Sequence, residues 1–319
     1  MPRPMGTWFN RGTACPICSH VCCAPCLDFA LYTDPKTITS MCKACYTSKC
    51  VIDLTQHVEI MGPSIEESAA PAVVFVHGGG GCRTMFKPHA QSLAAVNVRC
   101  VLLDLPGHGS RMDEPLTLES AIAVILDAAA LAGTWRGNVA PIYVGGSLGG
   151  YIGMEVLGQH PDVFSKAAIL MCGQNVGVNR GWAASLGLVM LDWISSSFSA
   201  TKLLKLMVDQ VHANGHLDSD VVEKDIKQCG FFFHQAKAQI AILKASNPAD
   251  ALKKYRGPVL FINGSKDHHD SDTIWLAAAT GPGSKLTVYD GGDHFFSHDT
   301  RFMPRFLDDL HAFVLPAAP

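Results

Sequence analysis

A serine enclosed by glycines, in the segment 145–149 (GGSLG), is the feature that most constrains the fold of this 319-residue chain. It directly follows the short apolar run 140–144, which predicts a buried strand. A G-x-S-x-G pentapeptide between a strand and a helix makes a turn so tight that only small residues fit around the serine. Such a turn holds the hydroxyl clear of the sheet, where a base can reach it. We therefore predict a strand, a sharp turn at Ser147 and a helix over 148–159.

Apolar runs and helical patterns alternate along the chain after residue 71. Further strands are expected at 72–76, 98–104, 166–171, 258–263 and 286–289. A helix is expected over 116–132 with Thr117 as its N-cap, and one or two edge strands within 50–61. This alternation favours a mostly parallel central sheet covered by helices on both faces.

A run of glycines, Gly78 to Gly81, follows His77 at the end of the strand 72–76. Because a backbone without side chains can approach an oxyanion closely, Gly79 or Gly80 would supply one N–H donor. The N–H of Leu148, the residue after the serine, would supply the other. A flexible connector and a phosphate-binding loop are alternatives, but no Gly-Lys-Ser/Thr sequence follows, which argues against the second.

An acid and a histidine follow two later strands. Asp267 lies just past the strand 258–263, and His294 ends the turn after the strand 286–289. A serine hydroxyl is a poor nucleophile unless a base takes its proton. We expect His294 to be that base and Asp267 to orient its imidazole. The nearby competitors are Asp270 and Asp272 for the acid, and His268, His269 and His298 for the base.

These motifs, together with the segment 104–109 (DLPGHG), make the chain resemble the α/β-hydrolase family from about residue 71 to the C-terminus. The order Ser, Asp, His is the one that this fold uses. The resemblance implies a small-molecule carboxylic ester with an apolar acyl or alcohol part, cleaved through an acyl-serine on Ser147. Thioester or amide cleavage, lyase chemistry on the same scaffold and a non-catalytic scaffold stay open as alternatives. We expect His77 and His108 to organise loops rather than to react.

A long insert separates the strand near Cys172 from the strand that begins at Pro258. Its length is far more than a strand-to-helix connection needs. Helical patterns at 182–208 and 221–244 predict a helical cap at about 174–250 over Ser147, with apolar side chains that form an acyl pocket. The same stripe is also compatible with ordinary core packing. The serines of this insert argue against a transmembrane span.

Eight of the twelve cysteines lie in the first fifty residues: Cys15, Cys18, Cys22, Cys23, Cys26, Cys42, Cys45 and Cys50. The pairs Cys23-x2-Cys26 and Cys42-x2-Cys45 match a four-thiolate zinc template. Cys15-x2-Cys18, with Cys22 or His20 and with Cys50, would form a second site. We predict a structural zinc-binding module over 1–50, whose metal is not needed for catalysis, followed by a hydrolase domain over 51–319.

The cysteine cluster is distantly similar to cross-braced zinc modules such as the FYVE class, although the basic Arg-His-His-Cys core of that class is missing. We therefore expect a structural role or docking to a protein or a membrane surface. The net charge of −3 argues against nucleic-acid binding. The segment 1–11 has no apolar stretch typical of a secretory signal, so the cytoplasm is the expected compartment, where disulfides are disfavoured.

Overall fold

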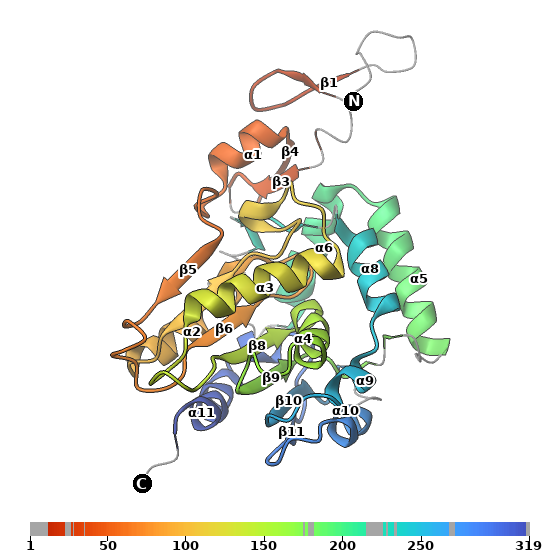
Figure 1. The fold of residues 1–319 in the computed structure, drawn as a ribbon. Helices are drawn as coiled ribbons and strands as arrows, with labels where there is room; N and C mark the ends of the chain where they lie inside the picture. Colours follow the sequence, from red (N-terminus) through yellow and green to blue (C-terminus); the bar gives the residue numbers. More distant parts are fainter. Residues whose placement is uncertain are drawn as a thin grey trace.

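The structure of this chain, a computed structural model, describes residues 12–22, 27, 29–34, 36–174, 176–177, 182–214, 226–227, 229–232, 235–267 and 272–316. Its largest element is a seven-stranded sheet with the strand order β11-β10-β9-β8-β6-β7-β5 (Figure 1). The strands are β5 Val58–Met61, β6 Val73–Val76, β7 Cys100–Leu103, β8 Ile142–Gly146, β9 Lys166–Leu170, β10 Val259–Gly264 and β11 Lys285–Tyr289. All neighbouring pairs are parallel except β5 and β7, which pair antiparallel at one edge.

Helices cover both faces of this sheet. Their bounds are α2 Lys87–Ala95, α3 Leu118–Ala132, α4 Leu148–Gln159, α9 Pro248–Leu252, α10 Asp272–Ala278 and α11 Met303–Val314. Alternate residues of β6 divide the core: Val74 and Val76 pack with α3 and α4, whereas Val73 and Phe75 pack with α2 and α11. Because both faces are covered, the central strands read as continuous apolar runs. The predicted α/β-hydrolase fold, with a mostly parallel sheet between helices, is confirmed.

Local sequence signals account for where these elements begin and end. The predicted N-cap is confirmed, because the Thr117 side chain accepts a hydrogen bond from the Ser120 N–H and the Ser120 hydroxyl accepts one from the Thr117 N–H. The capped helix is α3, and it ends at Gly133, whose positive φ of 77° is a conformation that glycine adopts readily. Six predicted strands lie within two residues of the observed ones at each end, and the region 50–61, where one or two edge strands were expected, contains β5. Short 3-10 helices follow some strands: η2 Arg83–Phe86, η3 Gly109–Arg111 and η6 Phe296–His298.

The insert is helical, as predicted, but its helices have different bounds from the predicted ones. The stretch predicted as one helix over 182–208 is two helices, α5 Trp182–Ser197 and α6 Ala200–Asn214. In the second predicted stretch, residues 226–227 and 229 are helical and helix returns as α8 Ala236–Ala245, while residues 221–225 lie outside the described part. Residues 230–232 are not helical, because Gly230 has a φ of 85° and the Phe232 N–H donates to the carbonyl of Gly80 at 2.9 Å. Within the described residues, no helix is long and apolar enough to cross a membrane.

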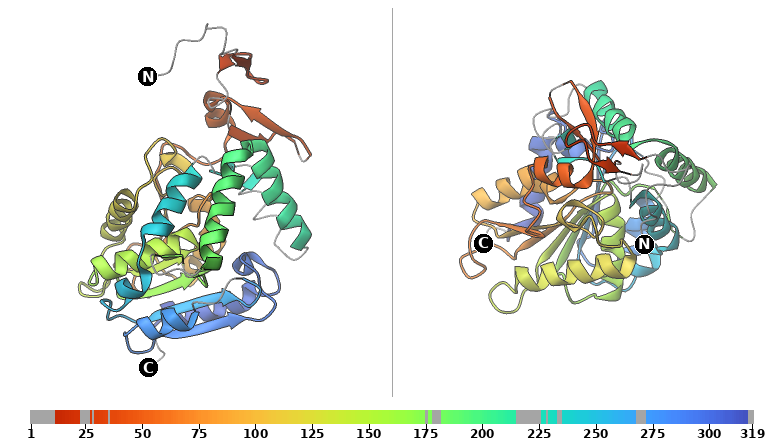
Figure 2. Two further views of the ribbon diagram at one scale, coloured as in Figure 1. Left: turned by 90° about the vertical axis from the view of Figure 1, so that its right-hand side faces the viewer. Right: turned by 90° about the horizontal axis from the view of Figure 1, so that it is seen from above.

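The described part of the N-terminal segment contains two small hairpins and one helix. These are β1 Thr13–Ala14 with β2 Val21–Cys22, β3 Phe29–Tyr32 with β4 Ile38–Met41, and α1 Lys43–Lys49. Figures 1 and 2 show this segment beyond the cap helices, at the end of the molecule far from β10 and β11. Ala30 of β3 packs with Leu204 and Val208 of α6. Since such hairpins are marginal alone, contacts such as this one with α6 contribute to the stability of the segment.

Candidate active site

Ser147 lies on a sharp turn between β8 and α4. Its backbone has a φ of 52° and a ψ of −120°, a conformation that L residues rarely adopt. The flanking glycines permit the turn, because a Cβ on Gly149 would lie 2.5 Å from the carbonyl oxygen of Val76. A Cβ on Gly145 would lie 2.7 Å from the carbonyl oxygen of Gly149. The pattern that marks this serine in the sequence is therefore a steric requirement of the turn.

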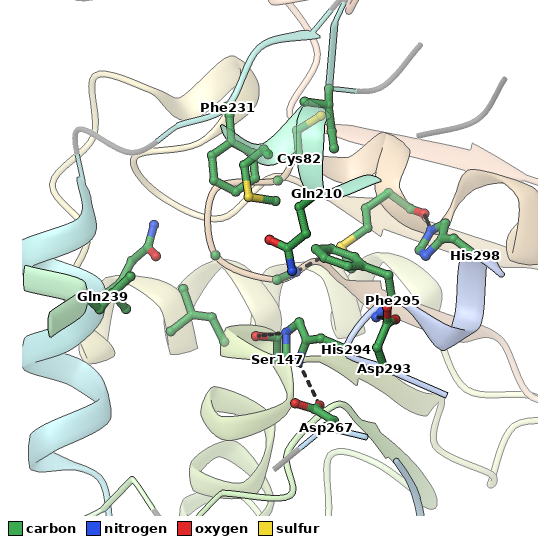
Figure 3. Close-up of a pocket in the computed structure, with 18 of the residues that line it drawn as sticks. Cys82, Ser147, Gln210, Phe231, Gln239, Asp267, Asp293, His294, Phe295 and His298 are labelled. Atoms are coloured by element: carbon green, nitrogen blue, oxygen red, sulfur yellow. Dashed lines mark hydrogen bonds and ion pairs between the residues drawn. The ribbon is translucent and has the colours of Figure 1, made fainter. Parts of the chain in front are cut away.

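His294 and Asp267 lie beside this serine (Figure 3). The Nε2 atom of His294 is 3.1 Å from Oγ of Ser147, and its Nδ1 atom is 2.8 Å from Oδ2 of Asp267. Asp267 follows β10 and His294 follows β11, so both come from the carboxyl edge of the sheet, as does the serine. The Asp267 side chain is 9% exposed and that of His294 is 38% exposed. The structure thus brings together the three residues that the sequence singled out.

The competing histidine at position 298 has other contacts. Its Nε2 atom bonds the carbonyl of Met85 at 2.8 Å, and its Nδ1 atom lies 3.0 Å from the Ser297 hydroxyl. His298 is therefore tied to the loop after β6 rather than to Ser147. The other competitors, His268, His269 and Asp270, lie outside the described residues, as does the Asp272 side chain.

In the loop after β6, one of the N–H groups predicted as oxyanion donors already makes a hydrogen bond. The Gly80 N–H donates to Nε2 of His108 at 3.2 Å, while Nδ1 of His108 bonds the carbonyl of Pro106 at 2.9 Å. Because the Gly80 N–H already has this partner, Gly79 is the candidate donor of the two alternatives in this loop. Among the described contacts, no hydrogen bond uses the N–H of Gly79 or of Leu148. These two remain the candidate donors.

His77 fixes the start of the same loop, as predicted. Its Nδ1 atom bonds the Gly78 carbonyl at 2.8 Å, and its Nε2 atom accepts the N–H of Leu105 at 3.0 Å. Burial lowers the pKa of His77, which keeps the ring neutral and able to accept the second bond. His77 and His108 therefore connect the loops after β6 and β7 without contacting Ser147.

A cavity of about 540 Å³ opens above Ser147. Most of its lining is apolar and comes from the core loops and from the cap: Met85, Leu148, Tyr151, Leu191, Met207, Ile226, Phe231, Leu243 and Phe295. Gln210 of α6 and Gln239 of α8 add amide groups to this wall (Figure 3). The volume lies in the range of small-molecule sites. The cap thus contributes apolar side chains to the pocket, as the insert predicted.

Gln239 is a site residue that the sequence did not indicate. Its Nε2 atom lies 3.0 Å from Nε2 of His108, and its side-chain oxygen packs against Gly79 so closely that a Cβ there would clash. Gln239 therefore contacts both the candidate donor loop and the histidine that holds it. A glutamine within an apolar helix carries no motif, so only its position over the loop reveals it.

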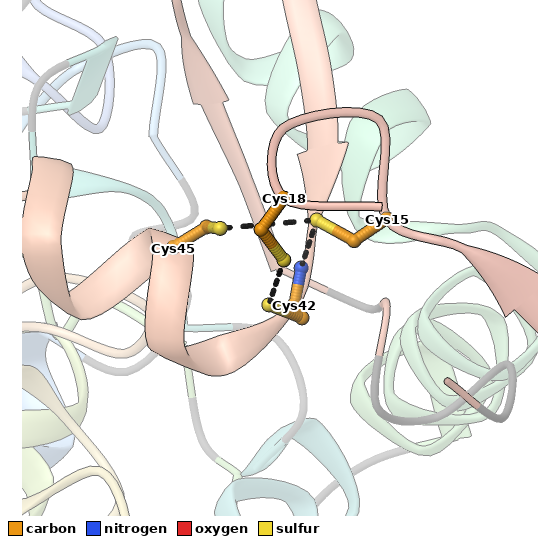
Figure 4. Close-up of side chains that lie close together, drawn as sticks. All are labelled: Cys15, Cys18, Cys42 and Cys45. Atoms are coloured by element: carbon orange, nitrogen blue, oxygen red, sulfur yellow. Dashed lines mark hydrogen bonds between the residues drawn. The ribbon is translucent and has the colours of Figure 1, made fainter. Parts of the chain in front are cut away.

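Four cysteine thiols meet in the N-terminal segment (Figure 4). The sulfurs of Cys15, Cys18, Cys42 and Cys45 all lie within 4.8 Å of one another. The separations between Cys15 and Cys45, 3.9 Å, and between Cys18 and Cys42, 3.7 Å, are close to the roughly 3.8 Å expected around a tetrahedral ion with Zn–S bonds of about 2.3 Å. This set of residues can therefore hold a metal ion.

The structure shows which of the described cysteines lie together. Cys42 and Cys45 meet Cys15 and Cys18, two cysteines that the sequence assigned to a second site. Cys23 and Cys26 lie outside the described residues. The two other members of the predicted set lie elsewhere: Cys22 bonds the carbonyl of His20 at 3.6 Å, and Cys50 bonds that of Cys229 at 3.6 Å. Sequence spacing does not choose between pairs that are equally spaced, whereas the fold of the two hairpins does.

A hydrogen bond within this cluster favours ionisation of one of its thiols. The backbone N–H of Cys42 donates to the Cys15 sulfur at 3.4 Å and lowers the pKa of that thiol to about 6. A thiol that ionises this readily suits a metal, because the thiolate is the ligand form.

Comparisons with known proteins agree with this architecture. A thermophilic esterase from Thermogutta terrifontis is 18% identical over 80% of this chain and 91% of its own, with a TM-score of 0.60. A monoacylglycerol lipase from Paleococcus ferrophilus is 15% identical over 81% and 97%, with a TM-score of 0.57. A putative non-heme bromoperoxidase, BpoC from Mycobacterium tuberculosis H37Rv, is 19% identical over 80% and 92%, with a TM-score of 0.57.

These likenesses show a shared fold and leave the substrate open. No curated protein sequence matches the chain significantly. The model of the alpha/beta hydrolase family matches residues 73–305, which is most of the chain and includes the Ser147, Asp267 and His294 positions. The chain therefore belongs to the alpha/beta hydrolase family.

Proposed function

We propose that this protein is a serine hydrolase that cleaves a carboxylic ester with an apolar acyl or alcohol part. The observation that carries the proposal is the continuous set of contacts from Asp267 to His294 to Ser147, at 2.8 and 3.1 Å, on the floor of an apolar cavity. A buried acid, an imidazole and a serine hydroxyl in this order are what nucleophilic acyl transfer requires.

The reaction would proceed in two steps. When Nδ1–H of His294 is donated to Asp267, Nε2 is left to accept the proton of Ser147 as its oxygen attacks the ester carbonyl. The negative oxygen would be held by the N–H groups of Gly79 and Leu148, each typically worth about 3 kcal/mol of transition-state stabilisation. The imidazolium would protonate the leaving alcohol, and water activated by the same imidazole would then release the acid.

The cavity supports the apolar part of the substrate. Its wall is formed mainly by aliphatic, aromatic and methionine side chains, so transfer of an acyl or alkyl chain from water into it is favourable. Two amides, of Gln210 and Gln239, are the polar groups contributed by the cap, and they would contact the ester end of the substrate rather than its chain.

The N-terminal segment has a separate role in this proposal. Cys15, Cys18, Cys42 and Cys45 would hold a zinc ion that stabilises two hairpins too small to fold alone. The zinc would take no part in ester cleavage. The segment would also offer a surface for docking to a protein or a membrane.

Replacement of the serine tests the catalytic assignment. We expect Ser147→Ala to abolish hydrolysis of p-nitrophenyl esters while its circular dichroism and metal content match the native protein. Ser92→Ala, on α2, is the matched control and should keep full activity, because its hydroxyl contacts His311 away from the cavity. Appreciable turnover by Ser147→Ala would refute the assignment.

Two further measurements separate the rival chemistries. Labelling of Ser147 by a fluorophosphonate requires an activated nucleophile, so an unlabelled protein would favour a non-catalytic scaffold. Trapping of an acyl-serine with a slowly hydrolysed ester would exclude a lyase. A panel of esters, thioesters and amides with graded chain lengths would then rank the acyl substrates by kcat/KM.

A further inference from the structure

Three cysteines from distant parts of the chain meet next to the candidate donor loop. Cys50 directly follows α1, Cys82 follows the glycine run after β6, and Cys229 precedes the turn at Gly230. The Cys82 and Cys229 side chains are buried in one cluster, and Cys50 packs against that cluster. The Cys50 sulfur also lies 3.6 Å from the Cys229 carbonyl oxygen. All three are thiols in the structure, and none belongs to the four-thiol cluster of the N-terminal segment.

We propose that Cys50 and Cys229 are a redox-active pair that forms a disulfide when a peroxide-class oxidant reaches the protein. Hydrogen peroxide would transfer one oxygen to the Cys50 sulfur, giving a sulfenic acid and one water. The Cys229 sulfur would then attack the Cys50 sulfur, form the S–S bond and displace the oxygen as a second water. In sum, two thiols and one peroxide give one disulfide and two waters.

The environments of the two thiols assign these roles. Cys50 is only partly buried, whereas Cys229 is 1% exposed, so an oxidant reaches Cys50 first. The interaction with the Cys229 side chain lowers the pKa of Cys50 to about 7, which favours the reactive thiolate. Contacts with the neighbouring thiols raise the pKa of Cys229. Because a sulfenic acid is neutral, oxidation of Cys50 would remove part of the interaction that raises the pKa of Cys229. The Cys229 thiol would then ionise more readily and attack.

The disulfide would join the N-terminal segment to the loop above the candidate active site. The two segments are already in contact, since the Tyr46 hydroxyl of α1 donates to the Cys229 carbonyl. Just past Cys229, the Phe231 ring packs against Gly80, and the Phe232 N–H bonds the Gly80 carbonyl. A covalent bond at Cys229 would therefore restrict the segment that lies on the glycine loop.

Peptide mapping tests the pair directly. The full-length protein is treated with hydrogen peroxide, its remaining thiols are alkylated, and its peptides are analysed by mass spectrometry. We expect a cross-linked peptide that joins Cys50 to Cys229 and that dithiothreitol removes. Cys229→Ser should lose this species, whereas Cys100→Ala, which removes a buried thiol of β7 outside the cluster, should keep it. The oxidised native protein should also melt at a higher temperature than the oxidised Cys229→Ser variant.

Three outcomes would overturn the proposal. A bond between Cys82 and Cys229 would show that the pair is wrong. Oxidation confined to Cys15, Cys18, Cys42 and Cys45 would show that Cys229 is inert. A zinc ion lost specifically on Cys229→Ser would show that the three thiols are metal ligands. Since every readout is a mass, a melting temperature or a metal content, the result does not depend on whether the protein hydrolyses esters.

Discussion

The imidazole of His108 accepts the backbone N–H of Gly80 at 3.2 Å, so a side chain after β7 holds the glycine loop after β6. A run of glycines has a large conformational freedom in the absence of such a contact. The bond fixes the direction of the neighbouring Gly79 N–H, which faces the cavity in the proposed reaction. Gln239 of the cap bonds the same imidazole and so connects the cap to this loop.

Loss of the His108 ring nitrogens should therefore slow catalysis without weakening substrate binding. For His108→Phe, which keeps a ring in the same buried space, we expect kcat to fall about tenfold with KM nearly unchanged. This is less than the 10²–10³ typical of a donor removed outright, since Gly79 itself remains. Steady-state kinetics with a short-chain ester measures this, and His57→Gln, which removes a ring bonded to Ser110 outside the cavity, is the control. An unchanged kcat would show that the loop holds its shape without His108.

Two glycines offer a matched pair for stability. Gly149→Ala would place a Cβ 2.5 Å from the carbonyl oxygen of Val76, and we expect the free energy of unfolding to fall by about 3 kcal/mol. Gly187 lies within α5, where the nearest atom to a new Cβ is 3.9 Å away. Gly187→Ala should therefore raise that free energy by about 1 kcal/mol through its higher helix propensity. Urea unfolding monitored by circular dichroism compares the two, and similar values for both would contradict the account of the turn.

The four-thiol cluster predicts a metal content that one substitution reduces. Cys45→Ser should remove one zinc ion per chain, because a tetrahedral thiolate site loses a ligand. Deletion of residues 1–50 should remove the same ion, because all four of these thiols lie in that segment. Elemental analysis of the purified protein measures this, with Cys100→Ala as the control. A native protein without bound metal would contradict both statements.

His89 makes the stability depend on pH in a defined window. Its ring is fully buried and bonds the Ser297 carbonyl at 2.8 Å, and burial, with a smaller effect of His298, lowers its pKa to about 3. The unfolded chain binds this proton near pH 6.5, whereas the folded chain does not. Between about pH 6.5 and 3 the free energy of unfolding should therefore fall with falling pH, by about 1.4 kcal/mol per unit from this residue.

The dependence on His89 can be isolated by substitution. His89→Gln removes the titrating group, so urea unfolding between pH 7.5 and 5 should show a smaller loss of stability than in the native protein. His212→Gln, at an exposed position of α6, should leave the native slope unchanged. Equal slopes for His89→Gln and the native protein would mean that His89 is protonated in the folded state.

The sequence predicts the sheet well because each buried strand is a continuous apolar run with polar or glycine-rich ends. It also points to Ser147, Asp267 and His294, since each follows such a run and parallel strands end at one edge. Their contacts at 2.8 and 3.1 Å come from the fold alone.

What the sequence did not predict depends on contacts between distant segments. Gly80 is indistinguishable from Gly79 in a glycine run until His108 takes its N–H. Spacing alone did not place Cys42 and Cys45 beside Cys15 and Cys18, which the packing of the described N-terminal segment brings together. The helix predicted over 221–244 is interrupted because Phe232 pairs with the glycine loop, a tertiary contact that overrides local propensity.

The position of β11 at the edge of the sheet has a consequence for inactivation. Among the described strands it pairs with β10 alone, and most of its residues are at least partly exposed. The strand before Ser147, by contrast, is central and fully buried. Edge elements open at lower free energy than central ones. Mild denaturant should thus displace the loop that carries His294 while the rest of the sheet persists. Ester hydrolysis should then be lost at a lower denaturant concentration than the far-ultraviolet circular dichroism signal.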